Sequence, residues 1–308
     1  MEKRLESSHK LAARITWEAS KQTYYTIRFL VDRERTADAF RAYAYFRWVD
    51  DRLDGGTLPR SKRVAFILSQ RELMERCYLG DPPGEVGVEE SMLVDLIRGD
   101  REKYGGLQSY IHNMMAVMAF DADRRGRLIQ QGELVNYTRW LATAVTDALH
   151  YFIGHDCPAP PCETRYLAAA AAHITHMLRD TLEDIKAGFF NVPREYLEAH
   201  RISPQDVTSE PYRMWVRSRV RLAQEYFKAG KHYLTQVSNF RCRLAGYSYI
   251  ARFEGLLDVI ARDGYRLQPD YAEYKNMGSG IKMGWSSISL ALENQRNGRM
   301  LPAPDESF

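Results

Sequence analysis

Apolar residues recur at intervals of three and four along most of this chain, and this period limits the folds open to it. The stretch TADAFRAYAYFRWVDDRLDGG, residues 36–56, carries apolar side chains at Ala39, Phe40, Tyr43, Phe46 and Val49. Side chains spaced in this way share one side of an α-helix, which turns once in about 3.6 residues. The stretch ends in a pair of glycines, which commonly terminate helices. We therefore predict a helix with one buried face.

The same period predicts more helices, and nothing in the sequence predicts a sheet. The further segments are about residues 61–78, 90–103, 107–123, 132–154, 163–187, 209–236, 240–263 and 277–295. Turn-forming residues separate them, as in GDPPGEVG and RISPQD. No alternating run is long enough for a strand. We expect an all-α chain with one domain over residues 1–298 and a polar, frayed tail at 299–308.

The composition limits the cellular setting and the partners. With 308 residues, of which 45% are apolar, the chain can bury a sizeable core. A formal net charge of +3, with both signs mixed throughout, argues against a nucleic-acid-binding surface. No segment reaches the roughly 18–20 apolar residues of a membrane span. Four cysteines without framework spacing, and a start without a signal-peptide core, favour a cytoplasmic protein with at most peripheral membrane contact.

The stretch YAYFRWVDDRLD places charges on a face that is otherwise aromatic and apolar. On a helix, Tyr43, Arg47, Asp50 and Asp54 lie within an arc of about 60°, with Asp51 to one side. One interpretation is a solvated acidic edge in which Arg47 pairs with the aspartate three residues on. The alternative is a cation site, because carboxylates among apolar side chains need a counter-charge.

A second row of potential ligands lies in HITHMLRDTLEDIKAGFFNVPREYL. His173, His176, Asp180 and Asp184 share one side of the predicted helix, and Arg179 flanks them. Each histidine taken alone is as easily explained by packing. The two aspartates, however, repeat the four-residue spacing of the first stretch.

Two aspartate pairs facing a common cavity, each beside an arginine, suit several hard cations together with an anion. Magnesium prefers carboxylate oxygens and substrate phosphates, and forked guanidinium groups suit diphosphate. Imidazole is a poor magnesium ligand, so His176 indicates either an indirect role, such as carrying a proton, or manganese. The predicted metal ligands are Asp50, Asp51, Asp54, His176, Asp180 and Asp184.

These two stretches resemble the two aspartate-rich motifs of the squalene/phytoene synthase family. The likeness includes the leucine and arginine before the second aspartate pair and the VPREYL after it. EASKQTYYTIRFL stands where that family has a Ser-Lys-Ser-Phe stretch, and YTRWLATAVTDALHYFIG resembles its Tyr-x-x-x-Val-Ala-Gly-x-Val-Gly helix. YIARFEGLLDVIARDGYRL is similar to its C-terminal helix. The chain is thus identified as a divergent member, with the resemblance covering most of its length.

The resemblance implies an all-α isoprenoid-synthase fold, a helical bundle in which both motifs face a central cavity. It also implies a magnesium-dependent prenyltransferase of isoprenoid biosynthesis. Diphosphate leaves an allylic prenyl donor, a second prenyl diphosphate captures the cation, and the chains join head to head through a cyclopropylcarbinyl diphosphate. The expected substrates are C15 or C20 prenyl diphosphates. NADPH use stays open, since the family needs no glycine-rich dinucleotide loop, and product release would involve at most peripheral membrane contact.

The resemblance further implies roles for individual residues. The predicted catalytic residues are Tyr43, Arg47, Tyr137 and Arg179. The predicted substrate-binding residues are Ser20, Lys21, Arg47, Tyr137, Thr143 and His173. Aromatic rings stabilise a cation without reacting with it, and Phe46 and Trp140 are further candidates for such a wall. Core packing is the simpler explanation for those two.

Several positions depart from the family pattern. His173 and His176 stand where glutamine and asparagine are usual, and Thr143 and Thr146 replace glycines, which should narrow the adjacent cavity. The other departures are Gln22 and Thr23 in the Ser-Lys-Ser-Phe stretch, Phe253 for a tyrosine, and GFFNVP, which lacks the arginine and tyrosine of GRxYxP. These changes do not affect the expected fold. They leave undetermined which substrate and product the protein has and whether it needs two substrates.

Other functions remain as alternatives. The two motifs would equally serve a single-substrate terpene cyclase or a prenyl diphosphate phosphatase, and product size separates these from head-to-head joining. A metal helix bundle for redox chemistry is a distant alternative, suggested by Asp147 and His150, although the full ligand set of di-iron bundles is missing. A non-catalytic prenyl-lipid-binding protein is a further alternative. It would be excluded if the protein shows turnover and this turnover is lost when an aspartate of either motif is replaced.

Overall fold

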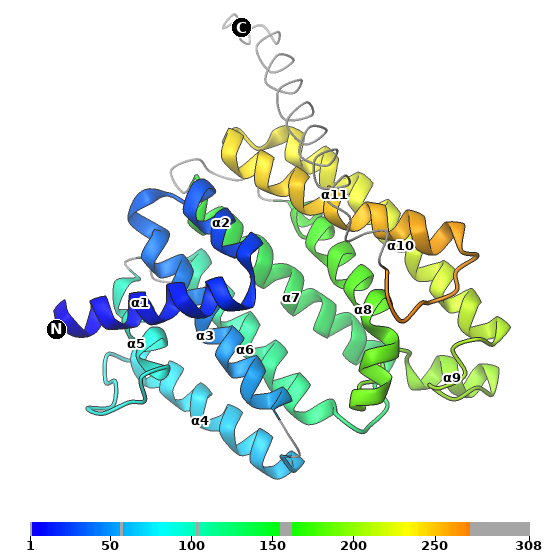
Figure 1. Cartoon of the computed structure of the whole chain (residues 1–308), viewed down its shortest axis with the longest axis horizontal. Helices are drawn as coiled ribbons and strands as arrows, with labels where there is room; N and C mark the ends of the chain where they lie inside the picture. The colour runs from blue at the N-terminus through cyan, green and yellow to red at the C-terminus, as the bar shows by residue number, and fades with distance from the viewer. Residues whose placement is uncertain (1, 56–57, 101, 103–104, 155–161, 272–308) are drawn as a thin grey trace, which may run out of the picture. The chain divides into compact units, whose positions relative to one another are not determined.

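The computed structural model describes residues 2–55, 58–100, 102, 105–154 and 162–271, which contain eleven α-helices, two short 3-10 helices and no strand (Figure 1). The prediction of an all-α chain is therefore confirmed for the described residues. The 3-10 helices are η1 (Arg33–Arg35) and η2 (Glu163–Tyr166). The α-helices are α1 (Glu2–Ala19), α2 (Lys21–Leu30), α3 (Thr36–Asp54), α4 (Arg60–Tyr78), α5 (Glu90–Gly99), α6 (Gly106–Arg124), α7 (Gln131–Phe152), α8 (Leu167–Ala187), α9 (Arg194–His200), α10 (Glu210–Gln236) and α11 (Phe240–Arg262).

The residues at which helices begin and end depend on local capping interactions, which the spacing of apolar residues does not predict. Ser20 separates α1 from α2 because its Oγ accepts a hydrogen bond from the Thr23 amide at 3.1 Å, which caps α2. The helix predicted over 90–103 stops at Gly99. The seven-residue helix α9 was not predicted, since so short a segment shows no period. The helix predicted over 277–295 lies outside the described residues.

The chain divides into two compact units that interleave along the sequence. The first comprises Met1–Asp156 and Glu183–Gln205, and the second comprises Cys157–Leu182 and Asp206–Phe308. Helix α8 contributes residues to both units. The single domain over 1–298 stays a prediction, and its proposed tail at 299–308 lies outside the described residues.

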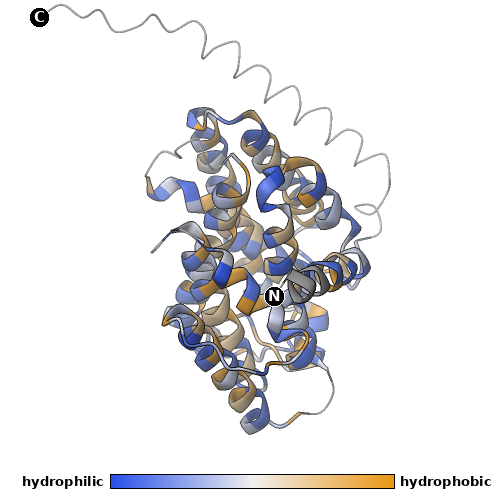
Figure 2. Ribbon diagram, turned by 90° about the vertical axis from the view of Figure 1, so that its left-hand side faces the viewer, coloured by the Kyte–Doolittle hydropathy of each residue, from blue (hydrophilic) through white to orange (hydrophobic). Residues whose placement is uncertain are grey.

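The core of the first unit holds α3 in place. Helix α3 packs against α1, α5 and α6, and α6 packs against α4 and α7. The helices carry hydrophobic and hydrophilic residues along the same ribbons, as amphipathic helices do (Figure 2). Fully burying one large apolar side chain contributes about 1.5–3 kcal/mol. Fully buried side chains of this core include Tyr45, Met74, Leu93, Leu107 and Ile111.

In the second unit, α10 packs against α11 and closely approaches the start of α8. A Cβ added at Gly230 on α10 would lie only 2.6 Å from Ala168 Cβ and 3.1 Å from its Cα. Such a contact is too short, so the glycine permits the two helices to approach this closely. Among the described residues, no helix is both long and apolar enough to cross a membrane.

Replacing Gly230 by alanine should lower the free energy of unfolding by about 1–3 kcal/mol, because overpacking outweighs the gain in helix propensity. Gly132 on α7 is the matched control, since an added Cβ there meets nothing within 4 Å. Gly132→Ala should therefore leave stability unchanged or raise it by up to about 1 kcal/mol. Chemical denaturation of both variants tests the pair, and equal effects would contradict the close approach.

Candidate active site

The first predicted motif lies on α3 in the first unit. Arg47 Nη2 lies 2.5 Å from Asp51 Oδ1 and Arg47 Nε lies 3.2 Å from Asp51 Oδ2, whereas Arg47 Nη1 is 3.6 Å from Asp50 Oδ2. The guanidinium thus pairs mainly with the aspartate four residues on. Both side chains of this pair are well exposed, so it contributes less than about 1 kcal/mol. Asp50 therefore keeps only a weak counter-charge.

Asp50 and Asp54 lie where negative charge is disfavoured. Burial, together with the neighbouring Asp54 and Asp121, raises the pKa of Asp50 to about 6, although Arg47 acts in the opposite direction. Burial and Asp121 likewise raise the pKa of Asp54. These carboxylates fit a hard cation such as magnesium, which takes oxygen ligands and would relieve their mutual repulsion.

Asp121 on α6 belongs to this site but is not among the residues predicted from the sequence. It accepts hydrogen bonds from the Tyr137 hydroxyl at 2.9 Å and from Arg124 Nε at 2.6 Å. Burial, followed by the charge of Asp121, holds the pKa of Tyr137 well above its ordinary value, so this hydroxyl keeps its proton. The Asp121–Arg124 pair at i, i+3 is visible in the sequence, but helix faces often carry such pairs.

Arg124 connects Asp121 with the second aspartate motif. Arg124 Nη1 donates to Asn191 Oδ1 at 2.8 Å, and Asn191 Nδ2 donates to Asp184 Oδ2 at 2.7 Å. We call the chain of hydrogen bonds from Tyr137 through Asp121, Arg124 and Asn191 to Asp184 the Asp121–Arg124 network. All its members belong to the first unit. It includes Asp184, a predicted metal ligand, and Tyr137, a predicted catalytic residue.

The end of α8 brings Asn191 back to Asp184. Gly188 follows the helix with φ of 88°, a left-handed conformation that glycine adopts without strain. The Phe189 amide donates to the Asp184 carbonyl at 2.7 Å, and the Gly126 amide donates to the Gly188 carbonyl at 2.7 Å. The Phe189 ring centroid lies 4.8 Å from the Arg124 guanidinium carbon. The GFFNVP segment thus contacts Arg124 through the Phe189 ring and the Asn191 side-chain amide.

The second unit holds the remaining part of the second motif. Arg179 and Asp180 form a two-point pair, with Nε–Oδ1 at 2.6 Å and Nη2–Oδ2 at 2.7 Å. The His176 ring packs edge-on against Phe253 with centroids 4.6 Å apart. Burial, and next the charge of Arg179, lowers the pKa of His176 to about 4, so the imidazole is neutral near pH 7. His173 is buried on the same helix.

The predicted substrate-binding residues outside these motifs have local roles. Ser20 caps α2, and the Lys21 ammonium lies 5.4 Å from the centroid of the Trp17 ring. Thr143 is half-buried on α7, the helix that carries Tyr137. Tyr43 is half-buried on α3. Their roles towards a substrate stay predictions.

Two other aromatic candidates lie in ordinary packing. Phe46 is 3% exposed and packs edge-on against Tyr110 with centroids 5.4 Å apart. The Trp140 ring lies 6.4 Å from that of Phe120. Asp147, which suggested a redox bundle, accepts a hydrogen bond from Ser109 Oγ at 2.6 Å. Core packing and internal hydrogen bonding thus account for these contacts.

The predicted ligands do not form one ready-made metal cage. Within the described part of the chain, no three Asp, Glu, His or Cys side chains converge closely enough to hold a metal ion. Asp50, Asp51, Asp54 and Asp184 belong to the first unit, whereas His176 and Asp180 belong to the second. The complete ligand set therefore stays a prediction.

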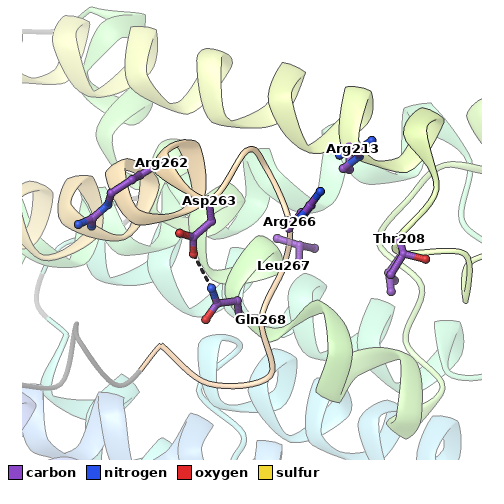
Figure 3. A pocket seen from close by; sticks show the side chains of 8 residues that line it. Thr208, Arg213, Arg262, Asp263, Arg266, Leu267 and Gln268 are labelled. Carbon is purple, nitrogen blue, oxygen red and sulfur yellow. Dashed lines mark hydrogen bonds between the residues drawn. The ribbon is translucent and has the colours of Figure 1, made fainter.

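A separate cavity of about 800 Å³ lies in the second unit, between the start of α10 and the segment after α11 (Figure 3). In that view Arg266 points towards Arg213, and Gln268 Nε2 donates to Asp263 Oδ2 at 2.5 Å. None of the predicted site residues contributes to its lining. The lining consists of Val207, Thr208, Arg213, Arg262, Asp263, Arg266, Leu267 and Gln268.

Asp50→Asn should stabilise the protein in EDTA at pH 7.5 by up to about 1 kcal/mol, because it removes a repelled charge that solvent partly screens. Since the native pKa of Asp50, about 6, exceeds its ordinary 3.8, protonation favours the folded state. The ionised Asp50 carboxylate therefore destabilises the folded state most above pH 7. The extra stability of the asparagine variant should vanish as the pH falls towards 4. Denaturation curves across this range measure the effect. Asp258→Asn, at an exposed position on α11, is the control.

Arg124→Met should lower the free energy of unfolding by about 3–5 kcal/mol, because it leaves Asp121 with a partly buried, unpaired charge. Arg60→Met removes an exposed arginine that pairs with Asp123 and should cost below about 1 kcal/mol. Urea denaturation compares the two. A loss of similar size in both variants would show that the Asp121–Arg124 network does not hold α6 to the segment after α8.

Known proteins share this sequence pattern and this fold. The profile of the squalene/phytoene synthase family matches residues 17–276. The 15-cis-phytoene synthase of Synechococcus elongatus is 20% identical over 285 residues, which cover 85% of this chain and 86% of that protein.

Solved structures show the same architecture. The squalene synthase HpnC from Alicyclobacillus acidocaldarius aligns with a TM-score of 0.65 at 18% identity, covering 86% of this chain and 97% of that one. A dehydrosqualene synthase solved with a ligand aligns with a TM-score of 0.68 at 15% identity, covering 97% and 99%. The predicted isoprenoid-synthase fold is thus confirmed. With the family profile spanning most of its length, this chain belongs to the squalene/phytoene synthase family and is a prenyltransferase of isoprenoid biosynthesis.

Proposed function

We propose that this protein joins two prenyl diphosphates of C15 or C20 length head to head, with release of diphosphate and dependence on magnesium. The observation that carries the proposal is the crowding of Asp50, Asp54 and Asp121, where burial first, and then repulsion between carboxylates, raises the pKa of Asp50 and Asp54. A polypeptide gains nothing in stability from such crowding. It is the arrangement expected where a cation and its anionic substrate bind together.

Magnesium would be held by the aspartates of the two motifs, Asp50, Asp51 and Asp54 with Asp180 and Asp184. When bound, it neutralises the charge that develops on the departing diphosphate. The neutral imidazole of His176 fits a softer ion better, so manganese is the alternative metal. With its pKa near 4, His176 is also a poor proton donor at neutral pH.

Arg47 and Arg179 would receive the diphosphate. Arg47 is bound to Asp51 and Arg179 to Asp180, each through two nitrogens. When substrate binds, each guanidinium exchanges its carboxylate for phosphate oxygens, and the carboxylate becomes available to a cation. This exchange keeps charges paired throughout, which lowers the cost of bringing a highly charged anion into the site.

Tyr137 contributes a protonated hydroxyl and a buried ring. Because its hydroxyl donates to Asp121 and its pKa is raised, it does not act as a base. Its ring packs against Phe120 with centroids 5.0 Å apart, which fixes its orientation. An aromatic face so fixed stabilises an allylic cation after the carbon–oxygen bond breaks and its electron pair leaves with the diphosphate. The second prenyl chain then supplies the electrons of its double bond to that cation. The cation left on the second chain loses a proton to the released diphosphate, and the electron pair of that C–H bond closes the cyclopropane ring.

Incubation with C10, C15 and C20 prenyl diphosphates, with magnesium, manganese or EDTA, tests this function. We expect organic extracts to contain products with the summed carbon count of two substrates. Products of one chain's carbon count would instead favour the cyclase or phosphatase alternative. Absence of diphosphate release under every condition would overturn the enzyme proposal.

Asp50→Asn and Asp121→Asn should each lower the rate of diphosphate release by about 10²–10³-fold, since each removes charge or order where the leaving group is stabilised. Tyr137→Phe should have a smaller effect, because it retains the ring. Asp258→Asn is the control and should keep the wild-type rate. Initial rates of diphosphate release measure all four, and a wild-type rate in Asp50→Asn would exclude a metal role for Asp50.

A further inference from the structure

Exposed aromatic side chains gather on one surface of the first unit. Among the described residues, nine large hydrophobic side chains are exposed, and the three aromatic ones all lie on α1 and α2. They are Trp17, Tyr25 and Phe29, exposed by 39%, 48% and 70%. The six others are aliphatic and lie far from this segment in the sequence. We call these three side chains the α1–α2 aromatic surface.

The rings of this surface support one another and are tied to the core. Tyr25 stacks on Phe29 with centroids 5.9 Å apart and meets the edge of Trp17 at 5.8 Å. Tyr24 contacts Trp17 at 5.1 Å and the buried Phe40 at 5.2 Å. The exposed rings therefore have fixed positions, which lowers the entropy lost when they bind.

Positive charge surrounds these rings. Between Ser8 and Val31 the sequence has four basic residues and one acidic residue, a local excess equal to the +3 of the whole chain. Lys21 lies over the Trp17 ring at 5.4 Å, and Arg28 is exposed next to Phe29. The one acid, Glu18, is 3.5 Å from Arg14, and both are about 60% exposed, so this pair is weak.

We propose that the α1–α2 aromatic surface docks this protein peripherally on an anionic lipid bilayer. Tryptophan and tyrosine rings prefer the boundary between lipid and water, and nearby lysine and arginine attract anionic headgroups. Phe29, the most exposed ring, would reach deepest into the acyl region. The choice of a lipid partner rests partly on the proposed function, since a product that has lost its diphosphates is a hydrocarbon that water does not dissolve.

Vesicle binding tests this without any substrate. Wild-type protein is sedimented with vesicles of phosphatidylcholine alone and of phosphatidylcholine mixed equally with phosphatidylglycerol. We expect binding to the mixed vesicles that weakens as salt is raised. The double variant Tyr25→Ser/Phe29→Ser should bind them at least about tenfold more weakly. The matched double variant Leu79→Ser/Val88→Ser removes two aliphatic side chains elsewhere that are exposed by 82% and 62%, and it should bind within about twofold of wild type.

Brominated lipids provide a direct readout of ring insertion. They should quench tryptophan fluorescence of wild-type protein, and Trp17→Phe should abolish most of that quenching. The proposal is overturned if wild type does not bind mixed vesicles, if the Tyr25/Phe29 double variant binds as tightly, or if both double variants lose binding equally.

Turnover on soluble prenyl diphosphates separates this proposal from the proposed function. Both double variants should retain it, because neither pair belongs to the predicted site. Turnover without vesicle binding would overturn the docking proposal alone, whereas vesicle binding without turnover would overturn only the proposed head-to-head reaction.

Discussion

Repulsion among partly buried carboxylates is the interaction on which the candidate site depends. Burial raises the pKa of Asp50 and of Asp54, and the charge of Asp121 on α6 raises both further. Within the Asp121–Arg124 network, the positive charge of Arg124 compensates the negative charge of Asp121. Asp50 on α3 has a weaker partner, because Arg47 Nη1 lies 3.6 Å from its Oδ2 and the guanidinium pairs mainly with Asp51.

The network also gives a physical account of one departure from the family pattern. An asparagine amide both accepts and donates, so Asn191 can bridge a guanidinium and a carboxylate at once. Phe189 meanwhile lies against the same guanidinium. The GFFNVP segment thereby keeps Asp184 attached to α6 without the arginine and tyrosine that family members usually have there.

Each aspartate motif contains an arginine bound to an adjacent carboxylate. Arg47 pairs with Asp51 one turn away, and Arg179 pairs with Asp180, its neighbour in sequence. These pairs are partly exposed and therefore exchange partners at low cost. Both motifs therefore hold their arginine and aspartate charges in exchangeable ion pairs.

The sequence alone determined the all-α class, most helix positions and the family, because apolar periodicity and the aspartate motifs are local patterns. It also placed Asp50 and Asp54 on one helix face, since that follows from helical geometry. Only the tertiary structure identified Asp121 and Asn191, because Asp121 meets Tyr137 from α7 and Asn191 meets Arg124 from α6, and no local spacing encodes those two contacts. It likewise showed that Arg47 binds mainly Asp51, and that Ile27 of α2 is buried whereas Tyr25 and Phe29 are exposed, since burial is decided by what packs against a helix and not by the helix itself.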